Sequence, residues 1–226
     1  VVGLCIARCL SKNGLNVLVI EKESRSGEGV SSRNSGVIHA GMYYPTYSLK
    51  AKLCVEGNKM LYDYARDNGI DHTKTGKLII SSTQEEHLKL VQIYNQGREN
   101  GVELEMITSK EAQGLEPEVK WFSAILSPNT GLIDAPQYVD RLESDIRSNG
   151  SLVIHNAEFL KANWKKDKFE IEINSEDKFN INTKFLFNCS GLNSYKVSNH
   201  ISPLNKDHIK KIYYGKGHYY KYHGYN

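Results

Sequence analysis

The sequence predicts an α/β protein with a buried parallel strand after an N-terminal helix and, elsewhere in the chain, a small antiparallel sheet. A helical pattern over residues 4–13 leads directly into the apolar run Val17–Ile20, which is typical of a buried parallel strand. The strictly alternating run Phe169–Ile173 is typical instead of an antiparallel strand with one face in water. A helix and then a strand so close to the first residue indicate a βαβ unit that lacks its first strand, so we interpret the chain as an internal part of a longer protein.

Glycine marks the end of each long helix that the sequence predicts. The four helices and their stops are residues 4–13 with Gly14, 49–68 with Gly69, 84–100 with Gly101 and 134–149 with Gly150. Their apolar faces are expected at Leu4, Ala7 and Leu10, then at Leu53, Met60, Leu61 and Tyr64, and then at Leu88 and Val91. Thr108 and Glu111 form a capping-box signature, which predicts a short additional helix.

Short apolar or alternating runs predict the strands. They lie at residues 17–20, 76–80, 152–154 and 185–187, with a small antiparallel sheet between 157 and 183. The charge cluster from Lys161 to Lys168 is interpreted as a solvated hairpin turn. Residues 24–47 are rich in glycine and serine and are expected to form a loop.

Composition excludes several classes of protein. The 226 residues carry 29 Lys and Arg against 26 Asp and Glu, a net charge of +3 that is dispersed along the chain, which argues against a nucleic-acid binder. No apolar run approaches the length of a membrane span, and no secretory signal pattern opens the chain. Four scattered cysteines predict neither a disulfide scaffold nor a metal site, and they fit a reducing compartment.

Gly3 and Glu21 are spaced like parts of a dinucleotide-binding βαβ unit. In that unit a glycine lets the helix approach its neighbours, the pyrophosphate lies at the helix N-terminus, and an acidic residue after the second strand binds the adenosine ribose. The first two glycines of the fingerprint are absent. A helix-packing glycine and an exposed glutamate at a strand end are the alternative.

The segment from Ser31 to Tyr44 combines small residues with directed hydrogen-bonding groups. Its glycines and serines would let backbone N–H groups approach a ligand, and its Asn, Ser and His side chains can orient one. From the residues alone the segment could equally be an ordinary polar loop, and His39 a structural hydrogen-bonding residue.

Two blocks within this half of the chain carry a family resemblance. The runs Asn34–Tyr44 and Ser48–Cys54 resemble the L-2-hydroxyglutarate dehydrogenase/oxidase family, which are FAD-dependent enzymes of the D-amino-acid-oxidase-like superfamily. Gly76–Leu78, Asn129–Asp134 and Cys189–Leu192 extend the similarity in collinear order. The resemblance implies a Rossmann-like FAD-binding domain interleaved with an α+β substrate domain.

The resemblance also implies roles for individual residues. The cofactor-binding residues would be Gly3, Glu21, Lys22, Ser32, Asn34, Ser35, Gly36, His39, Gly41, Ser190 and Gly191. His39 would also be the catalytic, proton-handling group, and Tyr43 and Lys216 are candidates for substrate binding. Arg33, where the family usually has His, and Lys216 and His218 in the tyrosine-rich tail depart from the family pattern.

We assign residues 1–75 and 136–200 to the FAD-binding domain and residues 76–135 and 204–226 to the substrate domain. The tyrosines among the last 14 residues are interpreted as part of an antiparallel strand pair or, alternatively, as lining of a substrate pocket.

The implied reaction is oxidation of an L-2-hydroxy acid, with L-2-hydroxyglutarate as the expected substrate, to the 2-oxo acid by hydride transfer to the flavin. The alternatives are an amino-acid, amine or glycerol 3-phosphate oxidase or dehydrogenase of the same superfamily, and a flavin-binding module without turnover. We expect weak or no FAD binding by the 226-residue chain alone.

The expected partners are a small 2-hydroxy acid and an electron acceptor, either a quinone or oxygen, with no nucleic acid. The expected location is the cytoplasm, with possible peripheral contact with the inner membrane, or the mitochondrion in a eukaryote.

Overall fold

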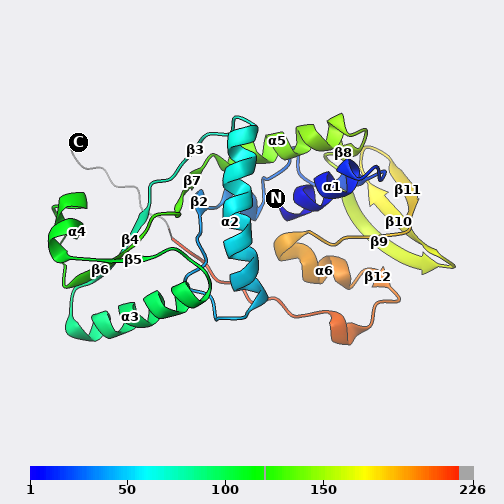
Figure 1. The fold of residues 1–226 in the computed structure, drawn as a ribbon. Coiled ribbons are helices and arrows are strands. Elements are labelled where there is room, and N and C mark those ends of the chain that lie inside the picture. The colour runs from blue at the N-terminus through cyan, green and yellow to red at the C-terminus, as the bar shows by residue number, and fades with distance from the viewer. Residues whose placement is uncertain (120, 219–226) are drawn as a thin grey trace. The chain divides into compact units, whose positions relative to one another are not determined.

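The computed structural model describes residues 1–119 and 121–218, and the chain divides into two compact units (Figure 1). Unit 1 combines Val1–Val30 with the chain from Ile146 onward, and unit 2 is the continuous segment Ser31–Asp145. The predicted cofactor and substrate domains have other boundaries, and that assignment stays a prediction. The predicted tyrosine-rich strand pair falls partly on residues 219–226, outside the described residues; Tyr213 and Tyr214 lie in irregular, exposed chain.

Unit 1 contains the parallel strand that the N-terminal pattern predicts, and this strand pairs with the one predicted at residues 152–154. Its helices and strands are α1 (Val2–Lys12), β1 (Leu18–Ile20), β8 (Leu152–Ile154), β9 (Glu158–Lys165), β10 (Lys168–Asn174), β11 (Lys178–Thr183), α6 (Ser194–Ser198) and β12 (Ile201–Ser202). Leu18 pairs with Leu152 in the parallel ladder of β1 and β8. Leu4 and Ala7 of α1 are buried as predicted.

A four-stranded sheet in the order β11-β10-β9-β12 forms the rest of unit 1. Ile171 and Ile173 of β10 are buried, whereas Glu170 and Glu172 alternate with them and pair with lysines of β9. This alternation confirms the predicted antiparallel strands with one wet face. The hairpin is confirmed, but its turn comprises only residues 166–167, with Lys166 at φ 58°; the rest of the cluster predicted from Lys161 to Lys168 belongs to β9 and the start of β10.

Unit 2 has two small sheets and the longest helix. Its elements are β2 (Val37–Ile38), α2 (Leu49–Asp67), β3 (His72–Thr73), β4 (Lys77–Ser81), α3 (Gln84–Glu99), β5 (Glu105–Ile107), α4 (Ser109–Leu115), β6 (Ser123–Ser127), β7 (Gly131–Ile133) and most of α5 (Ala135–Ser148). The sheets have the orders β2-β7-β3 and β4-β6-β5, with all pairs antiparallel. Met42, Leu90, Leu104 and Ile125 form the centre of its core.

The predicted helix ends are confirmed. Gly14, Gly69, Gly101 and Gly150 each follow a helix and have positive φ, the conformation that glycine adopts without a steric penalty. Thr108 and Glu111 form the predicted capping box at the start of α4.

Other expectations were wrong. Phe185–Phe187 is not a strand, because no neighbouring strand supplies a hydrogen-bonding ladder among the described residues, and Phe185 is 75% exposed. Leu53 and Met60 of α2 and Leu88 of α3 are also exposed. The buried residues of α2 are Ala51, Tyr62 and Ala65, and those of α3 are Leu90 and Gly97.

Candidate functional site

In unit 1 the predicted cofactor residues lie at the start of α1 and after β1. A Cβ added to Gly3 would lie 3.1 Å from the Cβ of Cys189, so this glycine permits the close approach of α1 to the 189–191 loop. The first turn of α1 has no side-chain cap. Glu21 follows β1 directly and accepts a hydrogen bond from the backbone N–H of Glu23 (3.1 Å), and Lys22 forms an exposed ion pair with Glu23.

The Ser190–Gly191 turn is shaped by a residue outside the predicted set. Asn188 accepts hydrogen bonds from the backbone N–H (3.3 Å) and the hydroxyl (2.6 Å) of Ser190 through Oδ1. Its Nδ2 donates to the carbonyl of Ser194 and the hydroxyl of Ser198, both at 2.9 Å. Asn188 therefore joins the turn to α6, which holds the predicted cofactor contact in one conformation.

In unit 2 the segment Ser31–Gly36 is also held by its own asparagine. Asn34 accepts from the N–H of Gly36 at 2.7 Å and donates to the carbonyl of Ser31. Gly36 has φ +66°, and a Cβ there would lie 2.9 Å from the carbonyl oxygen of Ile133, so the position requires glycine. Ser32 and Ser35 are exposed and accessible to a ligand.

The loop from His39 to Tyr44 is held by amide side chains from two helices. Asn58 of α2 donates to the carbonyl of His39 (3.1 Å), and Gln96 of α3 donates to that of Met42 (3.1 Å). Asn100 donates to the carbonyls of Gly41 (3.2 Å) and Tyr44 (2.9 Å). Irregular backbone needs such donors, because it lacks the hydrogen bonds of a helix or sheet.

This loop lines a small cleft together with Lys77 and Thr130. The ammonium group of Lys77 lies 4.8 Å from the ring centroid of Tyr43, and that of Lys50 lies 4.4 Å from that of Tyr44. Partial desolvation and, after it, the charges of Lys77 and Lys50 lower the pKa of His39. The imidazole is therefore neutral at physiological pH and can accept a proton, beside two cations suited to an anionic ligand.

The predicted site residues are thus divided between the units. Unit 2 brings Ser32, Asn34, Ser35, Gly36, His39, Gly41 and Tyr43 into one continuous segment, whereas unit 1 carries Gly3, Glu21, Lys22, Ser190, Gly191 and Lys216. Lys216 lies in exposed, irregular chain, and its role in substrate binding stays a prediction.

Sequence reasoning did not identify Asn58, Gln96, Asn100, Lys77 or Asn188 as supports of the site. Asn58 and Gln96 lie within helices, where one polar residue carries no distinguishing signal. Lys77 lies in the run Gly76–Leu78, which is part of the family resemblance. Membership of that run is the one sequence signal that could have identified Lys77.

Comparison with known proteins shows the family and the fold of the chain. A family model described as DAO, FAD dependent oxidoreductase, matches residues 1–225. The chain is 36% identical over 204 residues to "L-2-hydroxyglutarate dehydrogenase, mitochondrial" of Caenorhabditis briggsae, covering 88% of this chain and 47% of that protein. It is 33% identical over 244 residues to the protein of the same name from Homo sapiens, covering 97% and 53%. The chain spans about half the length of these curated relatives.

Solved structures share the fold. L-α-glycerophosphate oxidase from Mycoplasma pneumoniae, solved with FAD bound, has a TM-score of 0.71 at 23% identity, covering 75% of this chain and 46% of that one. L-Proline dehydrogenase from P. horikoshii has a TM-score of 0.75 at 19% identity, covering 88% and 52%. These similarities confirm the predicted fold class.

Proposed function

The chain belongs to the FAD dependent oxidoreductase family, and from this premise we propose that the protein oxidises an L-2-hydroxy acid, with L-2-hydroxyglutarate as the expected substrate, to the 2-oxo acid. The observation that carries the proposal is the neutral His39 in one cleft with Lys77, with the charge of Lys50 acting on it from α2. The names of the curated relatives support the same substrate.

The residues of the chain fit FAD. The N-terminal turn of α1 would present backbone N–H groups to the pyrophosphate, and Gly3, which has no side chain, lets this turn lie close to the 189–191 loop. Glu21 stands at the carboxyl end of β1, where an acidic side chain can accept hydrogen bonds from ribose hydroxyls. In unit 2, Ser32, Asn34, Ser35, Gly36 and Gly41 would bind the cofactor through backbone N–H groups and short polar side chains.

When bound, the flavin supplies the acceptor for the hydride that leaves the substrate carbon. His39 accepts the hydroxyl proton at a ring nitrogen, so that the alcohol becomes a carbonyl. Lys77 and Lys50 attract the carboxylates of the acid and keep His39 unprotonated before the substrate arrives. The amide groups of Asn58, Gln96 and Asn100 hold the loop so that His39 faces the substrate in a fixed orientation.

The test is an anaerobic visible spectrum of the protein expressed from its full gene, recorded before and after L-2-hydroxyglutarate is added. We expect a flavin absorption band that bleaches with this acid and remains with D-2-hydroxyglutarate, because only one enantiomer presents its hydrogen to the flavin. A band that remains with both enantiomers would reject the substrate and direct the assay to amino acids, amines and glycerol 3-phosphate. A protein without a flavin band would contradict the cofactor assignment.

The electron acceptor and location belong to the same proposal. We expect a quinone or oxygen to reoxidise the flavin. The names of the relatives favour a mitochondrial location if the source is a eukaryote, and for any other source we expect the cytoplasm. No helix within residues 1–119 and 121–218 is long and apolar enough to cross a membrane. Reoxidation of the bleached protein by oxygen or by a soluble quinone distinguishes the two acceptors, and flotation with liposomes tests the proposed peripheral contact.

A further inference from the structure

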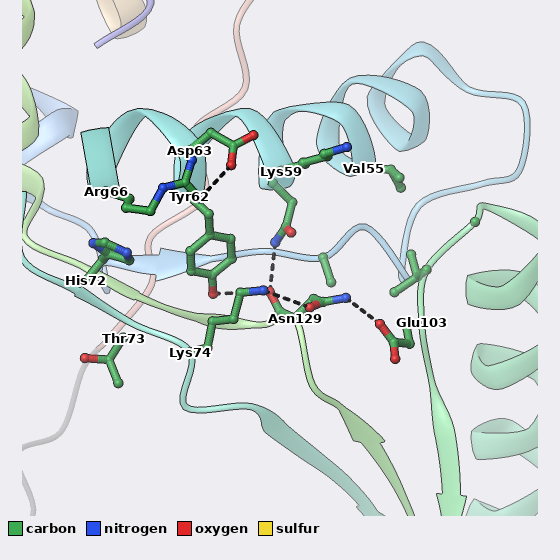
Figure 2. A pocket seen from close by; sticks show the side chains of 14 residues that line it. Val55, Lys59, Tyr62, Asp63, Arg66, His72, Thr73, Lys74, Glu103 and Asn129 are labelled. Carbon is green, nitrogen blue, oxygen red and sulfur yellow. Dashed lines mark hydrogen bonds and ion pairs between the residues drawn. The ribbon is translucent and has the colours of Figure 1, made fainter. Parts of the chain in front are cut away.

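A second, larger cavity lies in unit 2 against α2 (Figure 2). Its volume is about 740 Å³, within the range of small-molecule sites. It shares Ala40 with the His39 cleft but none of that cleft's titratable side chains. Neither His39 nor any of the predicted FAD-binding residues lines this cavity, so the cavity has no role in the proposed redox reaction.

Lys74 presents a positioned ammonium group to this cavity. Its Nζ lies 4.8 Å from the ring centroid of Tyr62 and donates a hydrogen bond to Oδ1 of Asn129 at 3.3 Å (Figure 2). Asn129 is itself held, because its backbone carbonyl accepts from Asn58 at 2.9 Å and from the hydroxyl of Tyr62 at 3.3 Å. Among the described residues no carboxylate forms an ion pair with Lys74.

The remaining charges of the cavity wall favour an anion. Lys59 extends from α2 and has no ion-pair or hydrogen-bonding partner in the part of the chain that the structure describes. Asp63 pairs with Arg66 at 3.0 Å, whereas Glu103 accepts a hydrogen bond from the neutral Nδ2 of Asn129 at 2.9 Å and keeps its negative charge. The three cations and two carboxylates of the wall leave a net charge of +1, and neither Lys59 nor Lys74 forms an ion pair among the described residues.

Apolar groups complete the wall. Ala40, Val55 and Val102 line the same cavity, so a short carbon chain could contact them while its charged ends reach the lysines. We propose that this cavity is a binding site for a small organic dicarboxylate, with Lys59 and Lys74 as the groups that bind its carboxylates. The site is separate from the proposed reaction, and its ligand is bound without being oxidised.

Lysine acetylation of the protein expressed from its full gene tests the site, with mass spectrometry reporting the rate at each lysine. Glutarate is the probe, since it has no hydroxyl to oxidise, and its uncharged diamide, glutaramide, is the control ligand. At glutarate about ten times above its Kd, acetylation of Lys59 and Lys74 should slow about tenfold, because only the unoccupied site reacts. Lys52, which is exposed on α2 and does not line the cavity, is the internal control.

Two variants complete the test. In Lys74→Met, the protection of Lys59 by glutarate should be lost, whereas Lys52→Met should retain it. Equal slowing at all three lysines, protection by glutaramide, or no saturable protection would overturn the proposal. The readout needs neither flavin nor turnover, so an inactive protein that still shows this protection would contradict the proposed function and leave the dicarboxylate site standing.

Discussion

At the scale of single residues, the chemistry of His39 depends on its surroundings more than on its identity. The sequence marked His39 as a candidate because a neutral imidazole can take a proton near physiological pH. The structure adds the reason for its neutrality, which is partial desolvation followed by the charges of Lys77 and Lys50. Lys77 comes from β4 and Lys50 from α2, so the sequence pattern around His39 alone could not predict this environment.

Replacing Lys77 by Met should raise the pKa of His39. The substitution removes the nearby positive charge and keeps the aliphatic stem, so the protonated imidazole becomes less unfavourable. The pKa should remain below its ordinary value, because the desolvation is unchanged. A proton NMR titration of the imidazole measures the shift directly, without reference to turnover.

The same variant has a consequence for the proposed reaction. Because His39 must be neutral to accept a proton, kcat/KM should fall as pH decreases through its pKa, and in Lys77→Met this fall should begin at a higher pH. Lys89→Met, which removes a lysine on α3 that is paired with Glu85, is the control and should leave the titration unchanged. An unshifted or lowered pKa in Lys77→Met would show that Lys77 does not act on His39.

At the scale of elements, local sequence signals were sufficient to predict where helices end. The face that each helix buries depends instead on contacts with elements that are distant in the sequence. Gly14, Gly69, Gly101 and Gly150 end helices because a positive φ is a property of the backbone at one position. The buried side of α2 depends instead on the His39 loop, on Asn129 in the turn before β7 and on Gly131 of β7, which lie against Asn58 and Tyr62 of the helix. This is why Leu53 and Met60, apolar and correctly spaced, are nevertheless exposed.

Gly131 shows how tightly those elements approach one another. A Cβ at this position of β7 would lie 2.2 Å from the carbonyl oxygen of Thr73 in β3 and 2.2 Å from the hydroxyl of Tyr62 in α2. We expect Gly131→Ala to lower the free energy of unfolding by about 1–3 kcal/mol, since the backbone must move to admit the methyl group. Urea unfolding of the two proteins, followed by circular dichroism, measures the difference.

Gly57→Ala is the matched control for this substitution. Gly57 lies in the middle of α2 with no atom within 4 Å of an added Cβ, so alanine there should be neutral or stabilising by up to about 1 kcal/mol. If both variants were destabilised equally, the loss would come from helix or strand composition and not from the contact of β7 with β3 and α2.

At the scale of the whole molecule, unit 2 is one continuous segment, and unit 1 is assembled from two segments that flank it. The sequence, through its family resemblance, predicted an interleaved architecture. It could not predict where the compact units divide, since that depends on the contacts within each unit. The first boundary falls between Val30 and Ser31, at the start of the segment proposed to bind FAD.

Because of this position, protease cleavage near the boundary can report whether FAD is bound. Arg33 is exposed in that segment, one residue from Ser32 and Asn34, so trypsin can cut after it when the protein is free of FAD. Binding of FAD to Ser32, Asn34 and Gly36 would order the backbone there, and a protease needs a locally opened chain.

We therefore expect FAD to slow cleavage after Arg33 several-fold, while cleavage after Lys166, in the turn between β9 and β10, keeps its rate. The two cuts are quantified by mass spectrometry, with and without FAD, in the protein expressed from its full gene. Equal slowing at both would indicate general stabilisation, and an unchanged rate at Arg33 would remove residues 32–36 from the cofactor site.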